Sequence, residues 1–299
     1  MSEVKIFWDP NGFELDTLGN KNYLKTTDGD TPSVSIPIRM LSIDTPEVHY
    51  PDRKPPSTQD NNLAQLAEWI QAGKAPIDKD LGLGAYLYPK LATRVAGTLQ
   101  EEQGKKATKQ FEELLEKKLT LPNGKKRNVF LWAADEHFDQ YGRLLAYMAP
   151  NYGAKELAAM PRKDRATFNL LMVESGWAAS FPIYPSIPSY LDLVMLQEMA
   201  KDAYDNKKGA WSDPMTLTGY EYRMFVRLHE ITKDLIDGKK LTSKERNSWI
   251  DRFCVDMTTK EIFYPQDYYK VAPYNRIFIW PEDVAEAVGK MNLVPPEQR

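Results

Sequence analysis

Hydrophobic residues recur at intervals of three and four along several parts of the chain, which is the spacing of one face of an α-helix. Glycine or proline follows most of these stretches and is a usual stop signal for a helix. The pattern predicts helices around Leu63–Ile70, Leu91–Leu99, Phe111–Lys118, Phe168–Ser175 and Leu196–Ala203. The last of these is preceded by Ser189 and Asp192, a weak capping box.

Shorter runs, rich in β-branched and aromatic residues, predict strands at Tyr23–Lys25, Val34–Ile43, Asn128–Ala134 and Leu144–Met148. Turn-forming residues at Thr26–Asp30 separate the first two runs. The order of strands and helices does not follow a β-α-β rhythm, and neither of the glycine-rich phosphate-binding motifs occurs. A parallel nucleotide-binding sheet is therefore disfavoured.

The last part of the chain, after about Pro214, has a different character. It contains a short helical piece around Trp249 and Ile250, an aromatic-rich stretch over Phe263–Trp280 and a helix near Val284–Val288. No recognisable motif lies there. We therefore expect residues 214–299 to be an appendage to a main domain.

Composition narrows the class of protein. The chain has 299 residues, a net charge of −3, three histidines without metal-ligand spacing and one cysteine, Cys254. It has no apolar run of the roughly 18–20 residues that a membrane span needs, and its first residues do not form a secretory signal. We expect a cytoplasmic protein with no membrane partner, although removal of a leader would allow secretion. Bulk charge cannot hold a nucleic acid here, so such chemistry requires a local site.

Two segments carry the most specific chemistry. The first contains Asp28-Gly29-Asp30-Thr31 and then Arg39-Met40-Leu41-Ser42-Ile43-Asp44-Thr45-Pro46-Glu47. The second is Asp139-Gln140-Tyr141-Gly142-Arg143-Leu144-Leu145-Ala146-Tyr147. In this order they closely resemble the motifs of the staphylococcal nuclease (thermonuclease-like) family. Looser matches at 173–178 and 207–212 extend the resemblance over about residues 16–213.

The resemblance implies an α+β fold with a mainly β core. It implies a five-stranded Greek-key barrel of the oligonucleotide-binding type with packed helices, over residues 1–213. The stretch between Glu47 and Arg143 is longer than in a minimal family member. Residues from about 50 to 100 are therefore expected to be an inserted helical segment that could restrict which substrates enter.

The resemblance also implies a calcium-dependent nuclease acting on DNA, RNA or both. Calcium prefers oxygen ligands, and those implied are the carboxylates of Asp30 and Asp44 and the carbonyl of Thr45. Glu47 would activate or position the attacking water. Arg39 and Arg143 have planar guanidinium groups that suit two-pronged contact with a phosphate.

Tyr141 and Tyr184 resemble family positions that contact the substrate. Tyr184 lies between Pro182 and Pro185 and could instead simply pack in the interior.

Two departures from the family pattern leave alternatives open. Asp30 and Arg39 are only nine positions apart, which spans at most about 30 Å and is too little for two long strands and a turn. Either that hairpin is trimmed, or Asp28–Asp30 is the turn itself and Asp16 is the metal ligand. Gln140 replaces a lysine of the family pattern, which removes a positive charge from the phosphate side.

Each motif alone also has a plain structural reading. Asp28–Asp30 is good hairpin-turn chemistry, and Thr45-Pro46-Glu47 is good chemistry for the start of a helix. The competing functional hypothesis is a non-catalytic module that binds nucleic acid or protein on the same barrel. A degenerate module has no reason to keep Arg39, Asp44, Glu47 and Arg143 together, so the sequence favours the enzyme.

Overall fold

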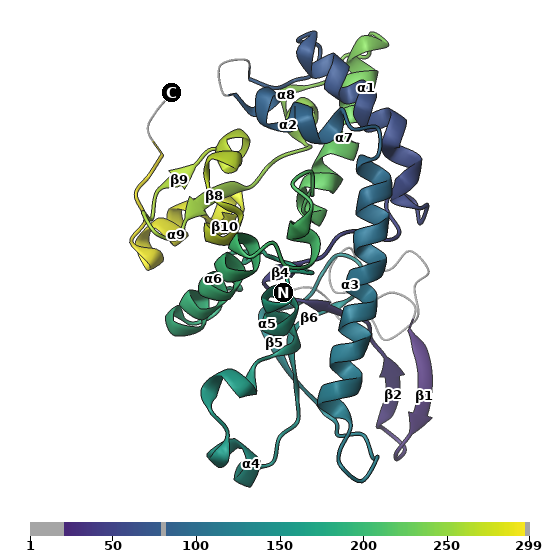
Figure 1. Ribbon diagram of the computed structural model, residues 1–299, viewed down its shortest axis with the longest axis vertical. Helices are drawn as coiled ribbons and strands as arrows, with labels where there is room; N and C mark the ends of the chain where they lie inside the picture. The colour runs from purple at the N-terminus through teal and green to yellow at the C-terminus, as the bar shows by residue number, and fades with distance from the viewer. Residues whose placement is uncertain (1–20, 79–81, 297–299) are drawn as a thin grey trace.

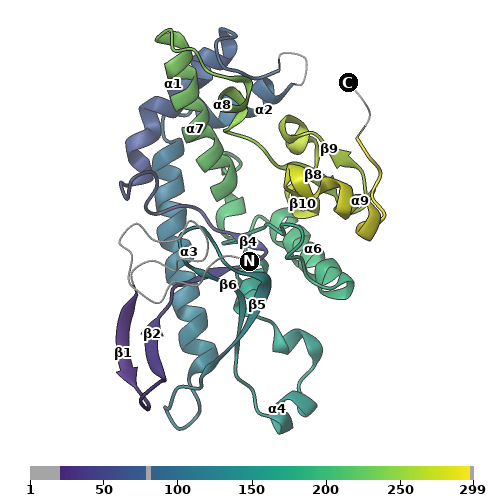
Figure 2. The ribbon, with the colours of Figure 1, turned by 180° about the vertical axis from the view of Figure 1, so that it is seen from behind.

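The long helix α3 (Ala96–Leu119) runs along the long axis of the molecule (Figure 1). The structure, a computed structural model, describes residues 21–78 and 82–296. The hairpin of β1 (Asn22–Thr26) and β2 (Pro32–Ser35) lies on one side of α3, and the C-terminal strands lie on the other, in both views (Figures 1 and 2). Within the described ranges, no helix is both long and apolar enough to cross a membrane.

Four helices build the larger hydrophobic core. They are α1 (Asp60–Gln71), α2 (Leu83–Leu91), the start of α3 and α7 (Gly219–Ile236). Leu63, Leu66 and Ala67 of α1 are completely buried against α7, whose Phe225 and Leu228 are equally buried. The helices predicted around residues 63–70 and 111–118 are therefore present. The helix predicted over 91–99 is instead broken, because α2 ends at Leu91 and α3 begins at Ala96.

The strands of the described part of the chain form small separate sheets and not a closed barrel. β3 (Ile38–Met40), β6 (Leu144–Pro150) and β5 (Val129–Phe138) form one sheet in the order β3-β6-β5. β4 (Ile43–Asp44) pairs only with β7 (Ala179–Ser180), and β1 pairs only with β2.

The predicted barrel differs from this arrangement for a local reason. The predicted strand over 34–43 is divided into three pieces. Pro37, which has no N–H to donate to a ladder, separates β2 from β3, and Ser42 adopts a φ of 58° between β3 and β4. The fold is α+β, but its larger core is made mainly by helices.

A second core connects the middle of the chain to its end. α5 (Phe168–Glu174) and α6 (Tyr190–Asp205) pack with the sheet of β10 (Arg276–Ile279), β8 (Phe253–Asp256) and β9 (Ile262–Phe263) and with α9 (Val284–Met291). Two short helices are α4 (Ala154–Ala159) and α8 (Ser243–Asn247). Single 3-10 turns lie at Pro56–Gln59, Arg162–Arg165, Gly209–Ser212, Pro265–Lys270, Pro273–Asn275 and Pro281–Asp283.

The sequence analysis missed α7, although its start carries a clear signal. Thr218 and Glu221 form a capping box, in which the Thr218 hydroxyl accepts from the Glu221 N–H and the Glu221 carboxylate accepts from the Thr218 N–H. The short helical piece expected around Trp249 is α8, which ends just before Trp249. The helix expected near Val284 is α9.

Glu221 is also the centre of a buried polar cluster that joins α7 to α2 and β10. Its side chain is 2% exposed and accepts hydrogen bonds from Tyr86 at 3.1 Å and Tyr268 at 3.2 Å. Arg276, also buried, lies 3.6 Å from the carboxylate. Burial alone would raise the pKa of Glu221, but the charges of Lys90 and Arg276 outweigh burial and lower it. We call these five residues the Glu221 cluster.

Candidate active site

The segment Asp44–Glu47 lies between two helices that come unusually close to it. A Cβ atom at Gly219, the first residue of α7, would be 2.3 Å from the Thr45 carbonyl oxygen and 2.7 Å from the Asp44 carboxylate. A Cβ atom at Gly104 of α3 would be 2.6 Å from the Glu47 carbonyl oxygen. All three distances are too short for any larger residue. The two glycines therefore fix how closely α3 and α7 approach the segment.

Asp44 is the best-satisfied group of the segment. It is 1% exposed, and its Oδ2 accepts from the backbone N–H of Tyr220 in the first turn of α7. Its Oδ1 accepts from Arg39 at 3.1 Å and from Arg223 at 2.9 Å. Asp44 thus caps α7, and two guanidinium groups and the positive end of the helix compensate its buried charge.

Arg223 joins the two acidic residues of the segment. One of its terminal nitrogens donates to Asp44 and the other to the Glu47 carboxylate. Glu47 is only partly covered, with its side chain 24% exposed. Burial alone would lower the pKa of Arg223, but the charges of Asp44 and Glu47 outweigh burial and raise it. Arg223 is therefore a permanent cation held between two carboxylates.

Arg39 lies in β3, beside the strand that Arg143 immediately precedes. β3 pairs with β6 in parallel, with Ile38 opposite Leu144, so Arg143 precedes the strand that lies beside Arg39. Burial lowers the pKa of Arg39, and the positive charges of Arg223 and Arg143 lower it further. Arg143 is 39% exposed and paired with Asp139 at 2.6 Å. We call Arg39, Asp44, Glu47, Arg143 and Arg223 the arginine–carboxylate cluster.

Other residues expected at the site lie elsewhere. Asp30 is in the exposed turn between β1 and β2 and accepts from the hydroxyl of its neighbour Thr31. The β1–β2 hairpin extends away from β4 in both views (Figures 1 and 2). The structure thus places Asp30 in the turn, as the alternative reading of Asp28–Asp30 had it. The competing ligand, Asp16, lies outside the described residues.

The two tyrosines differ sharply in exposure. Tyr184 is 5% exposed and packs in the second core, where its N–H donates to the Phe278 carbonyl. Tyr141 is 69% exposed, and the Arg143 guanidinium lies 5.3 Å from the centre of its ring. Only Tyr141 is therefore placed beside the arginine–carboxylate cluster.

The donors implied for calcium do not fit a divalent cation as they are arranged. Within the described ranges, no three His, Cys, Asp or Glu side chains are grouped to hold a metal ion. Arg223 lies between the carboxylates of Asp44 and Glu47, and α7 covers the Thr45 carbonyl. The cavity that touches Asp44 has a volume of about 10 Å³, whereas calcium takes 6–8 oxygen ligands. We therefore assign no catalytic step to a metal ion.

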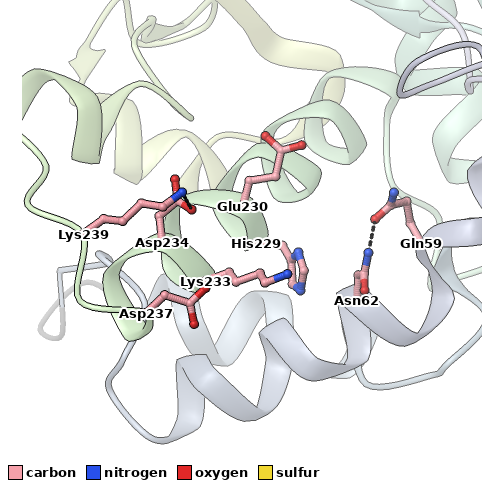
Figure 3. A pocket seen from close by; sticks show the side chains of 8 residues that line it. All are labelled: Gln59, Asn62, His229, Glu230, Lys233, Asp234, Asp237 and Lys239. Atoms are coloured by element: carbon pink, nitrogen blue, oxygen red, sulfur yellow. Dashed lines mark hydrogen bonds and ion pairs between the residues drawn. The ribbon is translucent and has the colours of Figure 1, made fainter.

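A larger pocket of about 350 Å³ lies away from this cluster, along the C-terminal half of α7 (Figure 3). Its lining mixes both signs of charge: Gln59, Asn62, His229, Glu230, Lys233, Asp234, Asp237 and Lys239. His229 is stacked on Trp69 at 5.1 Å, and burial lowers its pKa. Two of the lining charges, Lys239 and Asp234, are paired with each other at 2.7 Å. This pocket contains none of the residues that the sequence motifs single out.

Four of the five residues of the arginine–carboxylate cluster lie in a segment that matches a known protein family. The family model described as staphylococcal nuclease homologue matches residues 37–213, so this chain belongs to that family. Among curated proteins, endonuclease YhcR of Bacillus subtilis (strain 168) is 26% identical over 163 residues. The aligned part covers 53% of this chain but only 11% of that much longer protein.

The motifs could not reveal Arg223, because it lies outside the family match and 179 positions after Asp44. The capping box at Thr218 was the available signal. It predicts a helix that starts one residue later, and Arg223 then falls in the second turn of that helix.

Proposed function

We propose that this chain is a nuclease that hydrolyses phosphodiester bonds of DNA, RNA or both. The observation that carries the proposal is the grouping of Arg39, Glu47 and Arg143, partly exposed, around the buried Asp44 in a chain of the staphylococcal nuclease homologue family. The similarity to an endonuclease supports the same class of reaction.

The chemistry assigns one role to each group. Arg39 and Arg143 contact the phosphate and the negative charge that grows on its oxygens in the transition state. Arg39 donates to Asp44 through one terminal nitrogen, so its other N–H groups remain to face a phosphate. Glu47 takes a proton from the attacking water as the new P–O bond forms. The opposite P–O ester bond breaks, and its oxygen leaves with a proton from solvent.

Several finer assignments belong to the same proposal. We place the nuclease domain at residues 1–213, with 214–299 as a C-terminal appendage that packs against it and with 50–100 as the segment that restricts entry of substrate. The described part of that segment carries α1 and α2. Tyr141 is assigned to the substrate because it is exposed beside Arg143. Calcium, implied by the family resemblance, remains a prediction that the arrangement of Asp44 and Glu47 does not support.

A non-catalytic binding module is the second candidate, and one observation favours it. Arg223 donates to both carboxylates of the cluster, so its guanidinium group occupies a Glu47 oxygen that a general base would use to bind the attacking water. Such a module would use the exposed faces of Arg39 and Arg143 to bind a phosphate chain without cleaving it.

The deciding experiment is digestion of labelled single-stranded DNA and RNA by the full chain, in calcium, in magnesium and in EDTA. Glu47→Gln is the test variant, because an amide cannot take a proton from water. Glu230→Gln is the matched control, since Glu230 is an exposed residue of α7 paired only with Arg227 among the ion pairs described. We expect cleavage by the parent and by the control, and little by Glu47→Gln. Binding without cleavage in all three media would instead establish the binding module.

A further inference from the structure

Arg223 takes the position in which a cation would bridge Asp44 and Glu47. Its two terminal nitrogens each donate to a different carboxylate, at 2.9 Å to Asp44 and at a shorter distance to Glu47. Two carboxylates and a carbonyl within four residues are a donor set of the type that binds calcium. Here a guanidinium group supplies the positive charge instead.

The helix that carries Arg223 is anchored and does not rest loosely on the site. Asp44 caps the start of α7, and the glycine at position 219 allows direct contact with the Thr45 carbonyl. Further along α7, Tyr222, Phe225 and Leu228 are completely buried in the larger core. Moving Arg223 aside as part of the helix would therefore expose a large apolar surface, which is unfavourable.

The charge balance around Asp44 and Glu47 favours the guanidinium group of Arg223 over a divalent cation. Arg39 and Arg223 together neutralise Asp44 and Glu47, so a divalent cation placed beside them would add an uncompensated charge in a partly buried position. A cation binding here must displace Arg223 from both carboxylates, and the lost ion pairs count against its affinity.

We propose that Arg223 is a built-in competitor of divalent cations. It positions the carboxylates of Asp44 and Glu47 in the absence of metal, and it keeps their affinity for calcium low. It is a positioning residue, because it acts through these carboxylates. The relevance of this proposal to catalysis rests on the proposed nuclease function. The cation-binding part does not, since calcium binding can be measured without cleavage.

The test is calcium binding by the full chain without nucleic acid, measured by titration calorimetry and by the shift of the melting temperature. We expect the parent to show no saturable binding at millimolar calcium. Arg223→Gln removes the guanidinium group and frees the pair, so calcium affinity should rise at least about tenfold, a change of about 1.4 kcal/mol. Calcium should also raise the melting temperature of this variant, because a ligand that binds only the folded state stabilises it.

Three further variants make the result specific. Arg227→Gln is the matched control, since Arg227 is one turn further along α7 and pairs with Glu230 at an exposed position. It should behave as the parent does. Arg223→Lys keeps one charge but cannot donate to two carboxylates in a plane, so its calcium affinity should be intermediate. In the double variant Arg223→Gln, Glu47→Gln, the gained affinity should be lost.

Saturable calcium binding by the parent with an affinity equal to that of Arg223→Gln would overturn the proposal. So would the absence of binding by a folded Arg223→Gln protein. If that variant does not fold, Arg223→Lys decides in its place, and a calcium affinity equal to that of the parent counts against the proposal. A parent that binds calcium poorly and fails to cleave would reject the proposed function but leave this inference standing.

Discussion

Two charged clusters meet at the start of α7, and they differ in their access to water. The Glu221 cluster is closed: Glu221 and Arg276 are each less than 5% exposed, and the carboxylate accepts hydrogen bonds from Tyr86 and Tyr268. The arginine–carboxylate cluster has one buried member, Asp44, whereas its other charged side chains are 24–39% exposed. A closed cluster can only hold helices together, whereas a half-open one can also meet a substrate.

The largest effect is expected from Glu47→Gln on turnover. Loss of a general base typically costs about a hundredfold to ten-thousandfold in rate. Because Glu47 is partly exposed, its amide replacement should leave the fold intact. Single-turnover cleavage of a short DNA, with the melting temperature measured in parallel, checks both halves of the prediction. Parent-like cleavage by the folded variant would remove Glu47 from the mechanism.

Glu221→Gln should show the opposite behaviour. Breaking a buried ion pair by removing one partner costs about 3–5 kcal/mol of stability, since Lys90 and Arg276 would then face a neutral amide. Urea denaturation measures the loss. Glu230→Gln on the same helix, at an exposed pair, should cost at most about 1 kcal/mol. If the two variants are equally stable, the Glu221 cluster does not hold the helices.

The same variant has a pH signature. The pKa of Glu221 is lowered in the folded state, so its charge stabilises the fold above the unfolded pKa of about 4.3. That contribution is lost as the pH falls through the lower folded pKa. The parent should therefore lose stability in acid more steeply than Glu221→Gln. Denaturation curves collected from about pH 6 to about pH 3 give the free energy of unfolding of both proteins. An equal dependence on pH in the two proteins would contradict the lowered pKa.

Arg143→Lys should reduce turnover by about a hundredfold to a thousandfold, the usual contribution of one donor to a growing oxyanion. Lysine keeps the charge but loses the planar fork. Ground-state affinity for the substrate should change little, so the effect should appear in kcat and not in KM. A loss of substrate affinity without a loss of turnover would assign Arg143 to simple phosphate binding.

The smallest effect is expected from Tyr141→Ala. Stacking of a base on an exposed aromatic ring is worth about 1–3 kcal/mol in single-strand binding, and the ring lies beside Arg143. Tyr184→Phe is the contrasting variant, because that ring is buried in the second core and should not affect binding. Fluorescence titration with labelled single-stranded DNA compares the two. A larger loss of affinity for Tyr184→Phe would reverse the assignment.

The grouping of the neighbouring residues of the candidate site follows from the sequence itself. Asp44, Thr45 and Glu47 lie in one short segment just after Arg39, so their proximity follows from a few residues of chain. Arg143 is far along the chain, and only the family motif that contains it indicated the same site. The helices over 63–70 and 168–175 could also be predicted from neighbouring residues alone, since each is marked by its own hydrophobic face and a terminal glycine.

The parts that depend on distant segments were not predictable. Arg223 reaches Asp44 because the start of α7 packs directly on the Asp44–Glu47 segment, and no local pattern encodes that contact. The five-stranded barrel was an expectation from family resemblance. In the described residues, Pro37 and the turn at Ser42 break the strand run that it required. Tyr184 looked like a substrate contact in sequence, but tertiary packing buried it.

The separation between Asp44 and Arg223 also has a consequence for the order of events during synthesis. A ribosome makes Arg39, Asp44 and Glu47 early, at a stage when the partner guanidinium group 179 positions after Asp44 does not yet exist. Domains generally fold as units while the chain emerges from its N-terminus. The charge cluster therefore cannot close until α7 has left the ribosome. A nascent chain that is translated only as far as α6 has no means of completing it.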